Sequence, residues 1–177
     1  MIVETAYNGT LFRCVRHSTT EPLTGRFAAD GGGRWNPPSS FPVLYTFTAQ
    51  NLARTWVAAT WADVSVTLDE LQPELQPDLL ILEVAVDPVA DLASDAGLMA
   101  GGLPATYPEG FETRASWGVT RPVGVRIHDQ RLWGLITRSA SATSWTVPLV
   151  NWGEVAIFTE FAPEPKLVDR IPYPDWF

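Results

Sequence analysis

The chain has 177 residues, a length typical of a single domain with its own hydrophobic core. Hydrophobic residues make up 46% of the sequence and charged residues 18%, which excludes a largely disordered protein. The formal net charge of -8 opposes direct binding to nucleic acid, although one local basic pocket could still hold a small anion. We therefore expect one globular domain over residues 1–177.

Nothing in the sequence indicates a metal site, a disulfide or a membrane anchor. Cys14 is the only cysteine, and His17 and His128 lack metal-ligand spacing with other ligand residues. No stretch approaches the roughly 20 apolar residues of a membrane span, and the N-terminus lacks the pattern of an export signal. The sequence therefore predicts a cytoplasmic protein that holds no metal and contacts no membrane.

Apolar runs predict strands in the N-terminal part of the chain. Residues 11–15 form the first run, in which Arg13 points away from the face of its neighbours. An exposed edge position is the simplest interpretation of Arg13. Residues 18–42 have the composition of a loop, and residues 41–47 resume a strand pattern rich in aromatic and branched side chains.

A helix is expected after this second strand. Leu52, Trp56 and Ala59 recur at helical spacing, and Thr48 can cap the helix at its start. Residues 63–78 carry acidic side chains, glutamines and two prolines, which favour an irregular connection.

The C-terminal half is predicted to be mainly β. Residues 79–86 form a continuous apolar run that predicts a buried central strand rather than a helix, which would stop at Pro88. Asp91, Leu92 and residues 97–108 show little periodicity and are expected to lie in loops. The proline-rich C-terminal tail is expected to be held down by its aromatic side chains. Further strand patterns follow at residues 123–127, 132–137, 147–150 and 155–161.

The turn Gly31–Gly33 is followed directly by Arg34. Three successive glycines allow positive φ and let a ligand approach the backbone. The planar Arg34 guanidinium matches the oxygens of a phosphate or a carboxylate in pairs. Pro37 and Pro38 stiffen the exit from the turn. This stretch therefore predicts an anion-binding site.

The order of these motifs resembles a known family. The run GGGRWNPP, then VLY, then a helix, is similar to the signature of the RES domain, a toxin family of bacterial toxin–antitoxin pairs. The runs FRCVR, LLILEVAVDPVADLAS and GLITRSASATSW, the last followed by EVAIF, fit the rest of that family's pattern in order. The resemblance therefore covers nearly the whole chain.

The resemblance implies a fold and an activity. The expected fold is α+β and similar to ADP-ribosyltransferases, with a mainly antiparallel β core, flanking helices and a cleft for NAD. The expected activity breaks the nicotinamide–ribose bond of NAD, as an NAD glycohydrolase or an NAD phosphorylase, and the loss of NAD halts growth. The expected partner is an Xre-like antitoxin, which would supply the contact with DNA.

The resemblance also implies roles for particular residues. Arg34 and Arg13 would pair with the pyrophosphate of NAD, and Gly33 would let the dinucleotide approach. Tyr45 would stack on nicotinamide or bind a ribose hydroxyl, and Ser139 would bind the ribose or a phosphate. Arg34, Tyr45 and Ser139 are thus the expected catalytic residues. The alternative for Tyr45 is a core tyrosine with a satisfied hydroxyl.

One position departs from the family pattern. The family carries a glutamate on the helix eleven residues after the tyrosine of VLY, and Trp56 stands there in this chain. A carboxylate stabilises the oxocarbenium character that develops when an N-glycosidic bond breaks, and tryptophan has no negative charge. No acidic residue occurs between Thr48 and Ala62, and Asp63 would lie about 10 Å along the helix axis from position 56. The remaining candidates for a replacement are Asp30, Glu83 and Glu112.

This departure leaves alternative functions open. The first is a catalytically weak or inactive RES-like module that binds NAD, another nucleotide or a protein. The second is a purely structural partner protein, in which the glycines form only a tight turn and Arg34 a surface ion pair.

Overall fold

The structure is a computed structural model that describes residues 1–62, 65–111, 113–140 and 153–177. Within these residues, six strands form one sheet in the order β1-β2-β5-β4-β3-β6. The strands are β1 (Glu4–Arg16), β2 (Val43–Phe47), β3 (Pro77–Leu92), β4 (Gly134–Arg138), β5 (Gly153–Phe158) and β6 (Lys166–Ile171). The helices are α1 (Arg26–Gly31), α2 (Gln50–Trp61), α3 (Asp95–Gly101) and α4 (Trp117–Asp129), with 3-10 turns η1 (Leu68–Glu70), η2 (Pro73–Leu75) and η3 (Arg114–Ser116).

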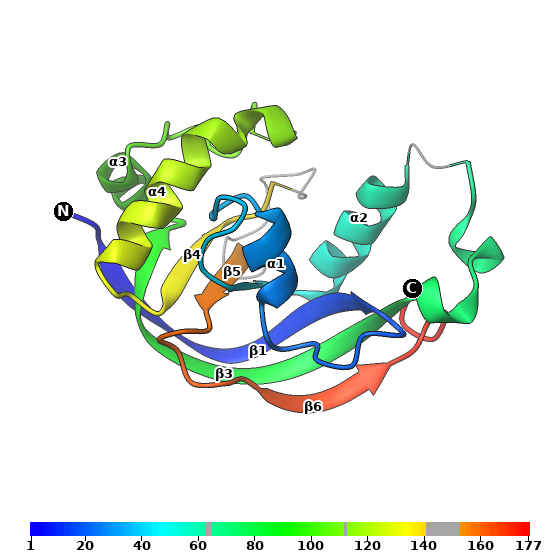
Figure 1. Ribbon diagram of the computed structural model, residues 1–177. Helices are drawn as coiled ribbons and strands as arrows, with labels where there is room; N and C mark the ends of the chain where they lie inside the picture. Colours follow the sequence, from blue (N-terminus) through cyan, green and yellow to red (C-terminus); the bar gives the residue numbers. More distant parts are fainter. Residues whose placement is uncertain (63–64, 112, 141–152) are drawn as a thin grey trace.

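The sheet curves back on itself. Strand β1 pairs with β2 near one end and with β3 along almost its whole length. The β3–β4 pair is parallel, and the other described pairs are antiparallel. In Figure 1, β1, β3 and β6 form a curved floor with the helices on its inner side, α2 at one end and α3 and α4 at the other. The predicted α+β class with a mainly antiparallel sheet is therefore confirmed.

Strand β3 is longer than predicted. Its first half is the expected apolar run, but it continues past Pro88 to Leu92, where it pairs with β4. Proline lacks the N–H that a regular ladder requires, and β1 shifts its register between Thr5 and Tyr7, opposite Pro88. At this irregularity one residue of β1 faces two residues of β3, which accommodates the proline, and the predicted loop at Asp91 is wrong.

The prediction of a strand at residues 123–127 is also wrong, because this segment lies in α4. The residues that α4 buries are Thr120, Val123, Gly124 and Ile127, which have the spacing of one helical face. Helices α1 and α3 likewise lie within segments expected to be loops. The strand predicted at residues 147–150 lies outside the described residues.

Helix α2 begins at Gln50 with Ala49 as its N-cap, not at Thr48. The Thr48 hydroxyl instead accepts a hydrogen bond from the Gly153 amide at 2.9 Å, and the Thr48 amide donates to the Gly153 carbonyl at 3.0 Å. These bonds join the end of β2 to the start of β5.

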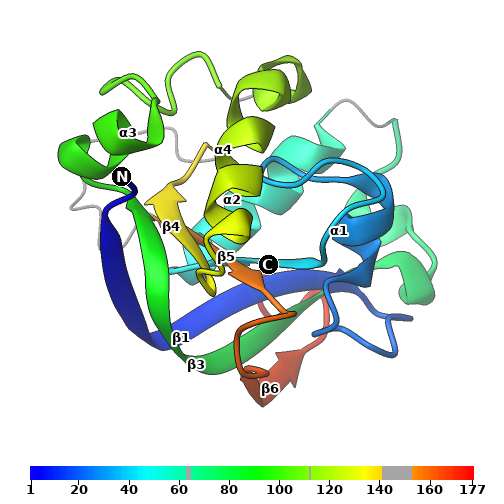
Figure 2. The ribbon, with the colours of Figure 1, turned by 60° about the vertical axis from the view of Figure 1, so that its left-hand side comes forward.

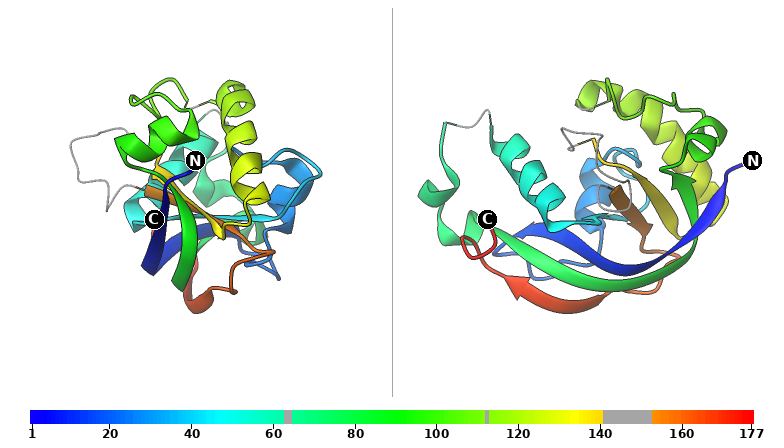
Figure 3. Two further views of the ribbon diagram at one scale, coloured as in Figure 1. Left: turned by 90° about the vertical axis from the view of Figure 1, so that its left-hand side faces the viewer. Right: turned by 180° about the vertical axis from the view of Figure 1, so that it is seen from behind.

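The C-terminal tail is held down as predicted. Trp176 is buried, and its indole N–H donates to the Pro77 carbonyl at the start of β3 with an N···O distance of 2.9 Å. Both views of Figure 3 show the C-terminus folded back on the body of the molecule. Among the described residues, no helix is both long enough and apolar enough to span a bilayer.

Candidate functional site

The glycine–arginine turn connects the end of α1 to β2, and it is too tightly packed for larger residues at Gly32 and Gly33, although not at Gly31. Gly32 has a φ of 71°, and a Cβ there would lie 2.7 Å from the Pro38 nitrogen. A Cβ on Gly33 would lie 2.4 Å from the Tyr45 hydroxyl oxygen. The glycines therefore serve packing of the turn itself, and Gly33 in particular makes room for Tyr45.

Helix α4 packs against the backbone of the turn (Figure 2). The Thr120 hydroxyl donates to the Arg34 carbonyl at 2.7 Å, and Arg121 Nε donates to the Gly33 carbonyl at 2.9 Å. Gly124 lies directly against the Trp35 carbonyl, where a Cβ would come within 1.8 Å of the oxygen. Three positions on one face of α4 thus fix the backbone of the turn.

Tyr45 connects β2 to the same turn. Its hydroxyl donates to Asn36 Oδ1 and accepts from the Trp35 amide, both at 2.9 Å. Asn36 is fully buried, and its amide nitrogen donates to the carbonyls of Ala28 and Phe41. Burial raises the pKa of the Tyr45 hydroxyl, which is therefore neutral at physiological pH. The Tyr45 hydroxyl has the satisfied partners of a core tyrosine, and it also positions the residues next to Arg34.

Arg34 projects from the turn toward the sheet and is partly exposed. Its Nη1 donates to the carbonyl of Phe111. Its positive charge lowers the pKa of Glu154, Tyr107 and Tyr45, so the guanidinium lies close to all three side chains.

Ser139 and Glu154 meet at the ends of two neighbouring strands. Ser139 follows β4 and is fully buried, and its hydroxyl donates to Glu154 Oε1 at 2.7 Å. Glu154, the second residue of β5, is paired in register with Thr137 of β4 and Phe47 of β2. Burial raises the pKa of Glu154, while the Arg34 charge and the Ser139 hydrogen bond act in the opposite direction. The structure therefore brings Arg34, Ser139 and Tyr45 together around a carboxylate that the sequence analysis did not single out.

Arg13 lies in β1, which pairs with β2, the strand that carries Tyr45. Its Nη1 donates to the Tyr45 carbonyl at 2.7 Å and its Nε to the Pro22 carbonyl at 3.1 Å. Burial lowers the pKa of Arg13 to about 10, so it remains charged at neutral pH. In the structure, Arg13 thus supports the main chain of β2 at Tyr45 and is not a free edge charge.

Tyr107 and Trp35 line the same region with unsatisfied polar atoms. Tyr107 is 1% exposed, and in the described parts of the chain its hydroxyl makes no hydrogen bond of regular geometry, although the side chains of Arg34 and Thr137 lie close enough to lower its pKa. The indole N–H of Trp35 likewise has no hydrogen-bond partner in these parts, and its ring centroid lies 6.1 Å from that of Tyr107. Because buried polar groups are normally paired, these atoms favour a site that a ligand or water completes.

Arg121 adds a second guanidinium to the site. Its charge lowers the pKa of Tyr45, and its guanidinium carbon lies 5.0 Å from the Trp117 ring centroid. Arg114 lies over the same ring at 5.4 Å. The sequence analysis missed this group because the adjoining segment was predicted to be a strand.

The expected replacement carboxylates do not reach this site in the described residues. Asp30 is exposed on α1, and Glu83 is exposed and bound to Lys166 of β6 at 2.8 Å. Glu112 lies outside the described residues. Trp56 is 41% exposed on α2, with its ring centroid 6.1 Å from that of Phe47.

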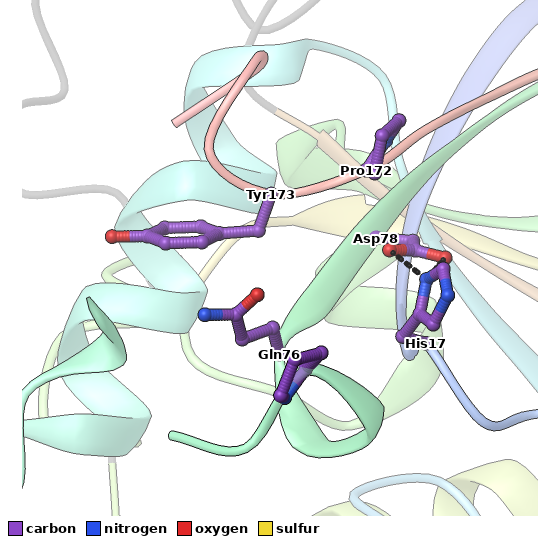
Figure 4. A pocket seen from close by; sticks show the side chains of 6 residues that line it. His17, Gln76, Asp78, Pro172 and Tyr173 are labelled. Carbon is purple, nitrogen blue, oxygen red and sulfur yellow. Dashed lines mark hydrogen bonds and ion pairs between the residues drawn. The ribbon is translucent and has the colours of Figure 1, made fainter. Parts of the chain in front are cut away.

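A separate cavity of about 140 Å³ lies where the end of β1, the start of β3 and the end of β6 meet (Figure 4). Its buried carboxylate, Asp78, binds His17 Nδ1 at 3.0 Å and Arg170 Nε at 2.6 Å. Arg170 also donates to the carbonyls of Thr19, Arg16 and His17. These bonds tie β6 to the end of β1 and the start of β3, which is a structural role. No cluster of potential metal ligands occurs in the residues that the structure covers.

Comparison with known proteins gives a family and a fold. Residues 10–176 match the RES domain. A chain from the crystal structure of the M. tuberculosis MbcT–MbcA toxin–antitoxin complex is similar in fold, with a TM-score of 0.69 and 18% sequence identity. The alignment covers 96% of this chain and 86% of that chain. Comparison with curated proteins gave no significant match.

Proposed function

Because the chain belongs to the RES domain family, we propose that it is the toxin of a bacterial toxin–antitoxin pair and that it degrades NAD. The family match and the similarity to a chain from a toxin–antitoxin complex support this proposal. The observation that carries it is the convergence of Arg34, Ser139 and Glu154 on one place from a loop and two strands.

The charges of the site suit a dinucleotide. Arg34 and Arg121 place guanidinium groups near Tyr45, where they can pair with pyrophosphate oxygens. Arg34 is partly exposed, and its guanidinium carries five N–H donors, one of which, on Nη1, binds the Phe111 carbonyl. The partly exposed ring of Trp117 offers apolar surface beside these charges. A local cationic site of this kind can hold an anion although the whole chain is acidic.

The proposed reaction breaks the bond between the ribose C1′ and the nicotinamide nitrogen. The bonding electron pair leaves with nicotinamide, which becomes neutral, and the ribose develops oxocarbenium character. A water molecule or a phosphate ion then bonds to C1′, and water loses one proton in that step. The products are ADP-ribose or its 1″-phosphate together with nicotinamide. These two acceptors correspond to NAD glycohydrolase and NAD phosphorylase activity. NAD is the substrate, and the proposal assigns no metal to the reaction.

An antitoxin is the proposed protein partner. The similar M. tuberculosis chain belongs to a toxin–antitoxin complex, and an Xre-like antitoxin would supply the DNA contact that the net charge of -8 disfavours here. We place both proteins in the cytoplasm, where NAD is consumed.

The test compares the wild type with R34A and with the matched control R26A. Arg26 is exposed on α1 and pairs with Glu21 at 3.5 Å, so its loss leaves the site intact. We expect wild type and R26A to release nicotinamide from NAD and to halt growth on expression. R34A should release nicotinamide at least about 100-fold more slowly, because the anchoring charge is lost. Growth inhibition by R34A equal to that of wild type would contradict the proposal.

A second function, nucleotide binding without chemistry, is favoured by one observation, the tryptophan at position 56. Calorimetry with NAD and ADP-ribose separates the two functions. Tight binding of NAD by a wild type that releases no nicotinamide would support the binding module.

A further inference from the structure

The position of Trp56 leaves the site without the carboxylate that the family carries on α2. Resting on the proposed cleavage of NAD, we propose that Glu154 of β5 is the carboxylate that stabilises the ribose as the glycosidic bond breaks. On this proposal the carboxylate stands on β5 instead of α2, and the tryptophan at position 56 does not imply a loss of activity.

The place of Glu154 in the sheet supports this inference. Register partners of neighbouring strands present their side chains on the same face, so Glu154, Phe47 and Thr137 share one face. The Trp56 ring packs against the ring of Phe47, which is the register partner of Glu154 on β2. Positions 56 and 154 therefore border the same part of the concave face, one from the helix and one from the sheet.

The surroundings of Glu154 differ from those of a structural carboxylate. Within the described part of the chain, no Lys, Arg or His nitrogen lies within 4.0 Å of it, although Arg34 is close enough to act on its charge. A partly buried carboxylate without a direct ion pair is unfavourable for folding, and such groups concentrate at functional sites. The Ser139 hydroxyl donates to Oε1 and the Ala140 backbone also donates to this carboxylate, and these hydrogen bonds fix its orientation without neutralising its charge.

The chemistry follows from this arrangement. As the C1′–N bond breaks, the ionised Glu154 stabilises the positive charge that forms on the ribose, and nicotinamide leaves with the electron pair. When water is the acceptor, the same carboxylate can take the proton that water loses and then release it to solvent. Arg34 and Ser139 hold the pyrophosphate and the carboxylate in place, so each of the three residues has a separate role.

A simpler explanation is that Glu154 only positions Ser139. The two roles are distinguished by moving the carboxylate. In the double variant E154Q/W56E, glutamine still accepts the Ser139 hydrogen bond, and the carboxylate returns to the family position on α2. Activity gained by this second substitution depends on the charge and cannot come from support of Ser139.

The experiment measures nicotinamide release and NAD binding for wild type, E154Q, E154Q/W56E and the control E83Q. Glu83 is an exposed carboxylate on β3, paired with Lys166, so E83Q applies the same chemical change away from the site. We expect E154Q to lower kcat by about 100-fold or more with NAD affinity retained, and E83Q to match wild type. The double variant should recover at least about tenfold of the lost kcat.

Other outcomes separate the inference from the proposed function. If wild type and E154Q release nicotinamide at the same rate, the inference is overturned and the function stands. If wild type binds NAD and releases no nicotinamide, the proposed function fails, and the catalytic role of Glu154 fails with it. If E154Q does not fold, the test uses E154D instead, whose carboxylate keeps its charge but lies farther from the site because aspartate is one methylene shorter. This variant should lower kcat at least about tenfold, and full activity of E154D would contradict the inference.

Discussion

Two carboxylates in the interior of this protein, Asp78 and Glu154, have opposite surroundings. Asp78 is 1% exposed and binds both His17 and Arg170, and Arg170 is further tied to backbone carbonyls. Glu154 accepts hydrogen bonds from the Ser139 hydroxyl and the Ala140 backbone, and within the described residues it has no ion pair with the nearby Arg34. The first carboxylate completes a set of partners that joins three strands. The second remains available to a ligand, and we infer that incomplete pairing distinguishes the site from the scaffold.

The largest effect on stability is expected from D78A. Removing Asp78 leaves Arg170 without its carboxylate, and loss of one partner of a buried pair destabilises a protein by about 3–5 kcal/mol. Arg170 is 31% exposed, so we expect about 3 kcal/mol, measured as the free energy of unfolding in urea. D175A, which removes an exposed aspartate of the tail, is the control and should match wild type. A loss of turnover per folded molecule in D78A would contradict the purely structural role of Asp78.

A smaller effect is expected from Y45F. The substitution leaves Asn36 Oδ1 and the Trp35 amide without their shared partner, which costs about 1–2 kcal/mol of stability. Because these residues adjoin Arg34, NAD affinity should weaken as well, as measured by calorimetry. The control is Y173F, which removes an exposed hydroxyl bound to Asp69. Unchanged stability of Y45F would show that the Tyr45 hydroxyl does not hold the turn.

The smallest effect concerns pH. The pKa of Glu154 is raised in the folded protein, so the protonated form is favoured there. Its contribution to stability is full below the unfolded pKa of about 4.3 and is lost as the pH rises through the folded pKa. Over the same range kcat/KM should increase, because the reaction needs the ionised form.

The measurement is thermal unfolding and turnover across this pH range for wild type and E154Q. E154Q should lose both trends, since it does not titrate. Persistence of the same pH dependence in E154Q would assign it to a group other than Glu154, and the neighbouring Tyr45 and Tyr107 are no candidates, because burial raises their pKa values and keeps them neutral over this range.

The sequence predicted the parts of the site that belong to local motifs. Arg34, Tyr45 and Ser139 lie in runs that have a recognisable order, and the structure brings them close to one another. Glu154 could not be predicted in this way, because its position depends on the register of β5 against β4 and β2. The one available signal was an acidic residue at the start of an otherwise apolar strand.

The fold shows a similar division. The apolar runs of β1, β2 and β3 are continuous and predicted strands correctly, whereas α4 was misassigned. Val123, Val125 and Ile127 alternate with small or polar residues, which is a strand pattern. The helix instead buries Gly124 with Val123 and Ile127, because the absence of a side chain at Gly124 lets the helix touch the Trp35 carbonyl. Because this contact depends on the absence of a side chain at Gly124, it produces no hydrophobic pattern in the sequence.

That contact also couples the position of α4 to the position of Arg34. Thr120, Arg121 and Gly124 hold three consecutive residues of the turn that carries the guanidinium, Gly33 to Trp35. A displacement of this helix would therefore move Arg34 directly, with no flexible segment between them to absorb the motion. A ligand that displaced α4 from its outer side would in this way change the position of Arg34 without touching it.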